Sequence, residues 1–411
     1  MDISVHILSS RADIMITVID SPCGYGKTSF AINMINDNPT GNYIYITPFL
    51  TEVKRVIKET QLGKARRFRQ PSYNGQDSSK MESFTNMLAN NEDIASTHAL
   101  FARCSKELAS LVEVGKYILI LDEVMDVLTV VDDIKKDDLM TILKAELAKI
   151  DEQTGQLIWL MDDYEGRYDE LKDYCDAGSV YVISDTVFVW TFPVELFKAF
   201  KDVYICTYMF DAQIQKYYFD FCGLEYKKVS VHNNELVPYT YDKVDMSKVN
   251  ILLDHKINNI GEGYYDLSKS WYSKHSDIKT LKSNIYNFIK NIAPHMAGTP
   301  IKWSKDVLWT TFNKFKDDVG DRRLKSSFLA CNTRATNDYI DTFIVIYAVN
   351  RFPNPVIVNF FNNLGIKMNL DAYALSEMIQ FICRSRVRRG EPIYCYIPSK
   401  RMRELLLEYC K

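Results

Sequence analysis

The sequence predicts an α/β protein made of two doubly wound parallel-sheet domains in tandem. Its 411 residues exceed what one ordinary hydrophobic core organises. Short apolar runs alternate with helical patterns in both halves, which is typical of parallel sheets covered by helices on both faces. A glycine-rich turn, SPCGYGKTS, directly follows the first apolar run, IMITVID. We place the first domain at residues 1–224 and the second at residues 225–411.

The composition excludes several classes of protein. With 47% hydrophobic and 25% charged residues and no low-complexity tract, the chain is expected to fold rather than remain disordered. No apolar stretch reaches the ~20 residues that a bilayer requires, and the amino terminus lacks an export signal. We expect a cytoplasmic monomer without a membrane partner. Nine cysteines without a CxxC pair fit reduced core thiols better than a disulfide framework or a zinc site.

The glycine-rich turn has the chemistry of a P-loop. Backbone N–H groups of such a turn face phosphate oxygens, and the following helix, SFAINMIND, favours the anion at its amino terminus. Lys27 would reach the β- and γ-phosphates and Thr28 would ligate Mg²⁺, while Ser21 stands where the pattern has its first glycine. The alternative is a glycine turn beside an exposed lysine. The residues expected to bind ATP are Pro22, Cys23, Gly24, Tyr25, Gly26, Lys27, Thr28 and Ser29.

A second apolar run, KYILILDEV, ends in the acid pair Asp122 and Glu123. A buried apolar strand that is followed at once by two acidic residues fits a Walker B element. Asp122 would hold Mg²⁺, and Glu123 would orient or deprotonate the attacking water. The alternative is a strand that simply leaves the core at an acidic turn.

Near the end of the chain, QFICRSRVRRG carries a glutamine followed by several arginines. On a helix, Gln380, Arg384 and Arg388 would share one face, and Arg386 would point away from it. Such a face would let the second domain contact a γ-phosphate held by the first. The sequence leaves open which arginine acts, and the alternative is a basic surface helix.

These motifs, in this order, resemble those of superfamily 2 DEAD/DEAH-like helicases, and the second half resembles small two-domain helicases of bacteriophages. NYIYITPFLTEVKRVI resembles motif Ia and IASTHALF resembles the TH element. VYICTYMF, DVLWTTF and FLACNTRATNDYIDTFIVIY stand in the places of motifs III, IV and V, although motif III reads Thr207-Tyr208-Met209 instead of its usual S/T-A-T. The arginine segment resembles motif VI, with Val387 at the position of its last arginine.

The resemblance implies two tandem RecA-like domains that bind ATP and Mg²⁺ in the cleft between them and grip one strand of nucleic acid, DNA rather than RNA. It implies Glu123, Gln380, Arg384 and Arg388 as catalytic residues. The residues implied in nucleic-acid binding are Thr47, Pro48, Thr97, His98, Arg334 and Thr336. It further implies a helicase of phage DNA replication or recombination, with partner proteins from those processes.

Residues 130–200 form an expected insertion in the first domain, with helices over KKDDLMTILKAELAKI and GQLIWLMDDYEGRYDELKDYC and a strand pair over SVYVISDTVFVW. It would either extend the core or provide a wedge or partner surface. Three functions stay open: a helicase or translocase, an ATPase that remodels protein–nucleic acid complexes without unwinding, and a scaffold with a degenerate nucleotide site.

Overall fold

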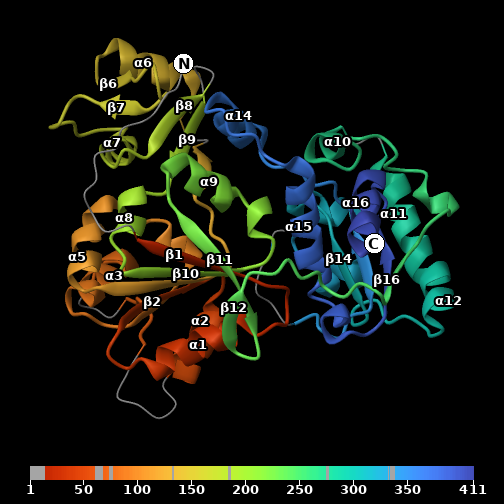
Figure 1. Cartoon of the computed structure of the whole chain (residues 1–411). Coiled ribbons are helices and arrows are strands. Elements are labelled where there is room, and N and C mark those ends of the chain that lie inside the picture. The colour runs from red at the N-terminus through yellow and green to blue at the C-terminus, as the bar shows by residue number, and fades with distance from the viewer. Residues whose placement is uncertain are drawn as a thin grey trace.

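The structure, a computed structural model, describes residues 14–60, 68–73, 77–131, 134–183, 187–274, 277–331, 333 and 338–411. It confirms the predicted fold class: two tandem α/β domains with parallel sheets, the first of them interrupted by an insertion. Figure 1 shows the first domain at the left, the second at the right in teal and blue, and the insertion above the first in yellow.

The first domain is built on a seven-stranded sheet in the order β12-β11-β1-β10-β4-β2-β3. All neighbours are parallel except the terminal pair, β11 and β12. These two strands follow residue 224, so the first sheet extends beyond the boundary predicted from the sequence. The strands are β1 (Met15–Asp20), β2 (Asn42–Thr47), β3 (Ile94–Thr97), β4 (Tyr117–Asp122), β10 (Asp202–Thr207), β11 (Tyr226–His232) and β12 (Glu235–Pro238).

Helices cover both faces of this sheet, because successive strand residues point to opposite sides. Ile16 and Val18 belong to one apolar cluster, whereas Ile19 packs in another with Ile32 and Ile35 of α1. The helices are α1 (Lys27–Asp37), α2 (Leu50–Thr60), α3 (Lys80–Ala89), α4 (His98–Phe101), α5 (Ala109–Val114), α8 (Val194–Lys198) and α9 (Ile214–Cys222), with 3-10 turns η1 (Lys106–Leu108) and η2 (Phe210–Ala212).

The insertion has its own small core and is more β-rich than predicted. Its two antiparallel sheets have the orders β5-β9-β8 and β6-β7. The predicted helix that begins at Lys135 stops at Lys144, because Glu146 takes a left-handed backbone (φ 54°) and the chain turns into a hairpin. The elements are β5 (Leu128–Val131), α6 (Lys136–Lys144), β6 (Ala148–Ile150), β7 (Leu157–Trp159), α7 (Asp169–Asp176), β8 (Val180–Ile183) and β9 (Val187–Thr191).

The second domain has a four-stranded parallel sheet in the order β13-β16-β15-β14. Its strands are β13 (Val249–Ile251), β14 (Val307–Thr310), β15 (Ile344–Tyr347) and β16 (Ile393–Tyr396). Its helices are α10 (Lys269–Ser273), α11 (Ile278–Asn287), α12 (Ala293–Ala297), α13 (Lys316–Val319), α14 (Pro355–Asn363), α15 (Leu370–Ile382) and α16 (Lys400–Cys410). The 3-10 turns are η3 (Lys256–Asn258), η5 (Asn313–Phe315), η6 (Arg322–Ser327) and η7 (Arg386–Arg389), and η4 (Phe288–Ile292) is a π-helical turn.

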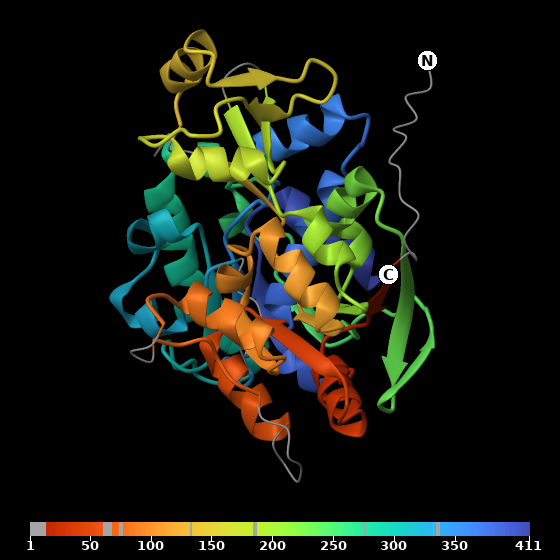
Figure 2. The same ribbon diagram turned by 90° about the vertical axis from the view of Figure 1, so that its left-hand side faces the viewer.

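One helix of the second half, α14, leaves its own domain and packs on the insertion. Its Phe360 contacts the rings of Tyr181 on β8 and Phe221 on α9, at centroid distances of 5.4 and 5.3 Å. Figures 1 and 2 both show α14, in blue, beside the yellow insertion. The insertion is therefore tied to both halves of the chain. Within the described ranges, no helix is both long enough and apolar enough to span a membrane.

Candidate nucleotide-binding site

The glycine-rich turn lies between β1 and α1, at the carboxyl edge of the first sheet. Its backbone has positive φ at Gly24 (90°) and Gly26 (87°), a conformation that side chains with a Cβ rarely adopt. A Cβ atom at Gly24 would lie 3.5 Å from Cγ of Arg388. The positive φ values therefore explain the glycines, and Arg388 of the second domain packs against the same turn.

Ser21 stands where the P-loop pattern has its first glycine, and the structure gives it a role. The residue is 1% exposed, and its N–H donates to the carbonyl oxygen of Thr207 at 3.1 Å. Its hydroxyl accepts a hydrogen bond of 2.9 Å from the N–H of Val231 on β11. The serine thus fastens the start of the turn to both strands that flank β1.

Lys27, the first residue of α1, folds back over its own turn. Its Nζ donates to the carbonyl oxygens of Ser21 and Pro22 at 2.6 and 3.0 Å. Burial lowers the pKa of Lys27, and the nearby carboxylates of Glu123 and Asp122 act in the opposite direction. An incoming phosphate would replace weak carbonyl acceptors with an anion, which a buried ammonium group favours.

Asp122 meets Thr28 and Tyr45 at the carboxyl end of β4. The hydroxyl of Thr28 donates to both carboxylate oxygens at 3.2 Å, and the hydroxyl of Tyr45 donates to Oδ2 at 2.9 Å. Burial, followed by the charge of Glu123, raises the pKa of Asp122 to about 6, against the effects of Tyr45, Lys27 and Thr28. A carboxylate and a hydroxyl oxygen side by side suit Mg²⁺, whose charge would relieve the buried acid.

Glu123 follows with a left-handed backbone (φ 77°), and its N–H donates to the carbonyl oxygen of Cys206 at 2.8 Å. Its side chain lines the cavity described below, together with that of Asp122. Its Oε2 is buried and has no hydrogen-bond partner among the residues that the structure describes. A buried acceptor without a donor is positioned to orient a water molecule or take its proton.

The prediction that Gln380, Arg384 and Arg388 share one helical face is wrong. Helix α15 ends at Ile382, and a separate 3-10 turn begins at Arg386 after the hydroxyl of Ser385 accepts the N–H of Val387. Arg384 and Arg388 nevertheless both line the same cavity as the glycine-rich turn. Gln380, 8% exposed on α15, is not among the residues that line this cavity.

Arg386 lies away from this cavity. Its guanidinium stacks over the ring of Phe343 at 4.2 Å and is 3.7 Å from the carboxylate of Glu391. The geometry therefore narrows the three candidate arginines to Arg384, which is 7% exposed, and Arg388.

The resulting cavity has a volume of about 230 Å³ and contains groups from both domains. Of the remaining residues predicted to bind ATP, Ser29 lines the cavity, whereas Pro22 and Tyr25 do not. The carbonyl oxygen of Pro22 accepts a hydrogen bond from Lys27, and the ring of Tyr25 packs 5.6 Å from that of His232. The lining residues are Cys23, Gly24, Gly26, Lys27, Thr28, Ser29, Glu52, Arg55, Asp122, Glu123, Arg384 and Arg388.

A disulfide links Cys23 in the glycine-rich turn to Cys383 in the second domain, across 360 residues of sequence. Their Cα atoms are 6.5 Å apart, within the range of protein disulfides. This corrects the expectation that all cysteines are reduced core thiols, which does describe the buried free residues Cys104, Cys175 and Cys206. The bond joins the two domains beside the cavity.

We expect dithiothreitol to increase ATP turnover of protein purified without reductant, because the bond prevents the domains from separating to release product. Peptide mapping without reductant should recover residues 23 and 383 in one linked peptide. The variant Cys383→Ser should be insensitive to reductant, and Cys410→Ser, at an exposed free cysteine, should respond like the wild type. Equal turnover of the linked and reduced wild type would contradict this expectation.

The predicted nucleic-acid contacts are placed unevenly. Thr97 caps α4, with its hydroxyl accepting the N–H of Leu100 at 3.4 Å, and His98 begins that helix. Both are half-buried, as is Pro48, whereas Thr47 is 0% exposed and faces no open surface. Arg334 and Thr336 lie outside the described residues. The structure thus leaves Thr97 and His98 as the better-placed candidates.

Several residues of the site escaped sequence reasoning. Asp20, 4% exposed, accepts the N–H groups of Met209 and Phe210 at 2.7 and 3.0 Å and so holds the turn after β10. Tyr45 orients Asp122. Arg55 reaches the cavity from α2, with Glu52 3.2 Å away. Two sequence signals could have indicated them: Asp20 ends an apolar strand, and Glu52 and Arg55 form a charged i, i+3 pair on a helix.

The turn after β10 also touches the second domain. The hydroxyls of Tyr208 and Tyr409 are 2.6 Å apart in a buried contact, and Gln213 donates to the hydroxyl of Ser376 on α15 at 3.2 Å. Asp20, which directly precedes the glycine-rich segment, therefore holds a turn that also contacts the second domain.

The fold and this cavity define a tandem-domain α/β protein with a P-loop-type turn. The chain belongs to the YonV family: it is 39% identical over 417 residues to the SPbeta prophage-derived uncharacterized protein YonV of Bacillus subtilis (strain 168), covering 96% of this chain and 98% of that protein. Family models match as the YonV C-terminal Rossmann-like domain at residues 244–410 and the YonV middle domain at residues 129–190.

Solved structures similar to this chain include the DUF1998 helicase MrfA bound to DNA and AMPPNP, with a TM-score of 0.37, 10% identity and 97% of this chain covered. The chain spans 48% of that MrfA structure. Mss116p bound to ssRNA and AMP-PNP gives a TM-score of 0.36 and 10% identity, with 95% and 66% of the two chains covered. The Pyrococcus furiosus Hef helicase domain gives a TM-score of 0.34 and 10% identity. The match covers 97% of this chain and 94% of the Hef chain.

Proposed function

We propose that this protein hydrolyses ATP in the cavity between its two domains and uses the cycle to move along a single strand of nucleic acid and unwind duplex. The observation that carries the proposal is the convergence of Lys27, Asp122 and Glu123 from the first domain with Arg384 and Arg388 from the second. When residues of both domains contact one ligand, cleavage of that ligand removes contacts between the domains. Hydrolysis can therefore change the relative position of the two domains.

In this proposal the chain's own groups have distinct roles. Lys27 binds the β- and γ-phosphates, and the N–H groups at the start of α1 face the phosphate oxygens. Thr28 and Asp122 would hold Mg²⁺, which neutralises phosphate charge when bound. Glu123 orients the attacking water and accepts its proton, while Arg384 and Arg388 stabilise the charge that develops on the transferred group.

The motion would follow from the state of this site. With triphosphate bound, both domains hold the same ligand and stay closed. After hydrolysis the arginines lose their anionic partner, and the domains separate. A strand gripped near Thr97 and His98 on one side and by the second domain on the other would then advance.

The prophage-derived relative supports an origin in a phage. We place the proposed activity in phage DNA replication or recombination, in the host cytoplasm. DNA is the expected track, the expected active form is a monomer, and replication or recombination proteins are the expected partners. The alternative function is a nucleic-acid-stimulated ATPase that remodels protein–nucleic acid complexes without unwinding.

The test compares ATP hydrolysis alone and with single-stranded DNA, duplex DNA and RNA at one fixed salt concentration, because affinity for phosphate backbones depends on salt. The proposal predicts strongest stimulation by single-stranded DNA and displacement of a strand from a tailed duplex. Stimulation without displacement on any tailed duplex would favour the remodelling function. Hydrolysis that no nucleic acid changes would contradict both.

Replacing Lys27 by alanine is expected to abolish turnover and weaken ATP binding about ten- to hundredfold, the usual effect of losing a hydrogen bond to a charged group. Titration with fluorescent ATP and a phosphate-release assay measure the two effects. The matched control is Lys54→Ala, at an exposed lysine of α2 that does not line the cavity. If Lys27→Ala hydrolysed ATP at the wild-type rate, the glycine-rich turn would not be part of the ATPase site.

A further inference from the structure

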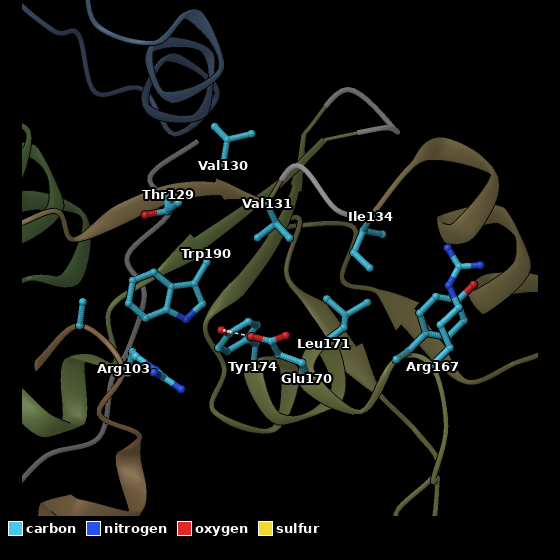
Figure 3. A pocket seen from close by; sticks show the side chains of 12 residues that line it. Arg103, Thr129, Val130, Val131, Ile134, Arg167, Glu170, Leu171, Tyr174 and Trp190 are labelled. Atoms are coloured by element: carbon cyan, nitrogen blue, oxygen red, sulfur yellow. Dashed lines mark hydrogen bonds between the residues drawn. The ribbon is translucent and has the colours of Figure 1, made fainter. Parts of the chain in front are cut away.

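A second cavity, of about 690 Å³, lies between the insertion and the first domain. Its lining comes from four stretches of the chain: the segment after α4, strand β5 with Ile134 beyond it, helix α7 with the turn before it, and strand β9. Figure 3 shows Trp190, Tyr174 and Arg103 at one end of this cavity and Arg167 at the other, with the apolar side chains of Val131 and Leu171 between them. The proposed ATPase site does not use any of these groups.

The aromatic end of the cavity is held in place from behind. Trp190 meets Phe192 edge-on at 6.3 Å, and Phe192 packs on Phe101 of α4 at 5.3 Å. Tyr174 lies 6.1 Å from Trp190. The indole of Trp190 is half-buried, and its N–H makes no hydrogen bond with any residue in the described part of the chain. A fixed aromatic ring with an unused donor, beside an open cavity, suits a flat heterocyclic ligand.

The charges around the cavity favour an anionic ligand. Arg103 is exposed and has no ion-pair partner among the residues that the structure describes, and its charge acts on the phenol of Tyr174. Arg167 lies 3.0 Å from Asp138 and is 72% exposed. The one carboxylate in the lining, Glu170, accepts a hydrogen bond of 2.9 Å from Tyr174. Arg103 is therefore the open charge beside the aromatic rings.

The location connects this cavity to the expected path of nucleic acid. Thr97 caps α4 and His98 begins it, and Arg103 follows only two residues after that helix ends at Phe101. On the other side, β5 follows β4, which carries Asp122, after a short connection. A strand held at the start of α4 needs to continue past the end of this single helical turn to reach Arg103.

We propose that this cavity binds a base of the single strand, with Trp190 stacking on the base and Arg103 contacting an adjacent phosphate. The inference rests on the proposed function, since it extends the track of the strand onto the insertion. It assigns the insertion a part in gripping nucleic acid instead of only enlarging the core. The apolar stretch between the two arginines accommodates the ring of a base, and the phosphate stays at the exposed rim.

The test measures binding of a fluorescently labelled oligothymidylate by anisotropy over a range of salt concentrations. We expect Trp190→Ala to bind about tenfold more weakly, as for the loss of one stacked base, and Trp190→Phe to retain most of the affinity. Arg103→Ala should bind more weakly and lower the salt slope by about one. Lys149→Ala, at an exposed cation of the insertion outside the cavity, should match the wild type.

A second readout does not depend on the alanine variants folding. An oligonucleotide that contains 4-thiothymidine, irradiated on the wild-type protein, should crosslink to the peptide that carries Trp190 or Arg103. If the wild type binds the oligonucleotide but both alanine variants bind equally well and no such crosslink forms, the inference is overturned and the proposed function stands. The cavity would then suit a segment of a partner protein. If the wild type binds no nucleic acid, the proposed function fails together with the inference.

Discussion

Replacing Glu123 by glutamine is expected to lower ATP turnover about 10²- to 10⁴-fold while leaving ATP affinity close to that of the wild type. Glutamine has almost the same shape but accepts no proton, so water can still enter and ATP can still bind. The buried, unpartnered Oε2 of Glu123 is the observation behind this expectation. Single-turnover hydrolysis at saturating ATP measures the chemical step, and equilibrium titration with fluorescent ATP measures the affinity.

The matched control for this prediction is Asp126→Asn, because Asp126 is an exposed carboxylate three positions further along that does not line the cavity. It should hydrolyse ATP at the wild-type rate. If Glu123→Gln also did so, Glu123 would not be the catalytic base, and the acid pair would serve only to hold the metal.

Removing the arginines of the second domain is expected to have an effect of similar or larger size. Arg384→Ala or Arg388→Ala should lower the rate of hydrolysis about 10³- to 10⁵-fold for whichever residue stabilises the transition state. Replacing the other arginine is expected mainly to weaken ATP binding, because that arginine would contact the bound nucleotide equally well before and during the reaction. Measuring the catalytic constant separately from ATP affinity distinguishes the two roles, which the structure narrows to Arg384 and Arg388.

Arg386→Ala is the matched control, because this guanidinium lies on Phe343 and near Glu391, away from the cavity. It should leave the rate within a small factor of the wild type. A large loss in Arg386→Ala, with little change in Arg384→Ala and Arg388→Ala, would mean that the second domain meets the nucleotide in another way.

The elements around the nucleotide cavity were predictable because their signals are local. The run IMITVID forms β1, and the glycines after it have the positive φ that their positions require. The acids of KYILILDEV stand at the end of β4, next to β10 and two strands away from β1. Parallel strands bring their carboxyl ends to one edge of a sheet, so residues 94 positions apart, Thr28 and Asp122, come into contact.

The shape of the arginine segment was not predicted correctly, although a signal was present. Ser385 offers a hydroxyl to the backbone N–H of Val387, which favours the start of a new turn over continuation of the helix. Because the helix ends before these arginines, residues four positions apart no longer lie on the same side of the segment. Arg384 and Arg388 reach the cavity through this break in the helix and not along one face of it.

The insertion and its contacts could not be predicted from local patterns. The short strands β6 and β7 pair with each other, and their apolar residues also fit a helix, so periodicity alone did not distinguish the two. Ile357, Phe360 and Phe361 of α14 have the i, i+3, i+4 spacing of any core-facing helix. Only the tertiary structure shows that they pack with the first domain and the insertion. The disulfide between Cys23 and Cys383 likewise depends on the meeting of the domains.

The most direct test of the account is the position of the γ-phosphate in an experimental structure of the reduced protein bound to AMPPNP and Mg²⁺. The account predicts that its oxygens lie about 3 Å from Nζ of Lys27 and from a guanidinium nitrogen of Arg384 or Arg388, the distance of a charge-assisted hydrogen bond. A nucleotide held by the glycine-rich turn alone, with both arginines turned to solvent in the closed protein, would contradict it.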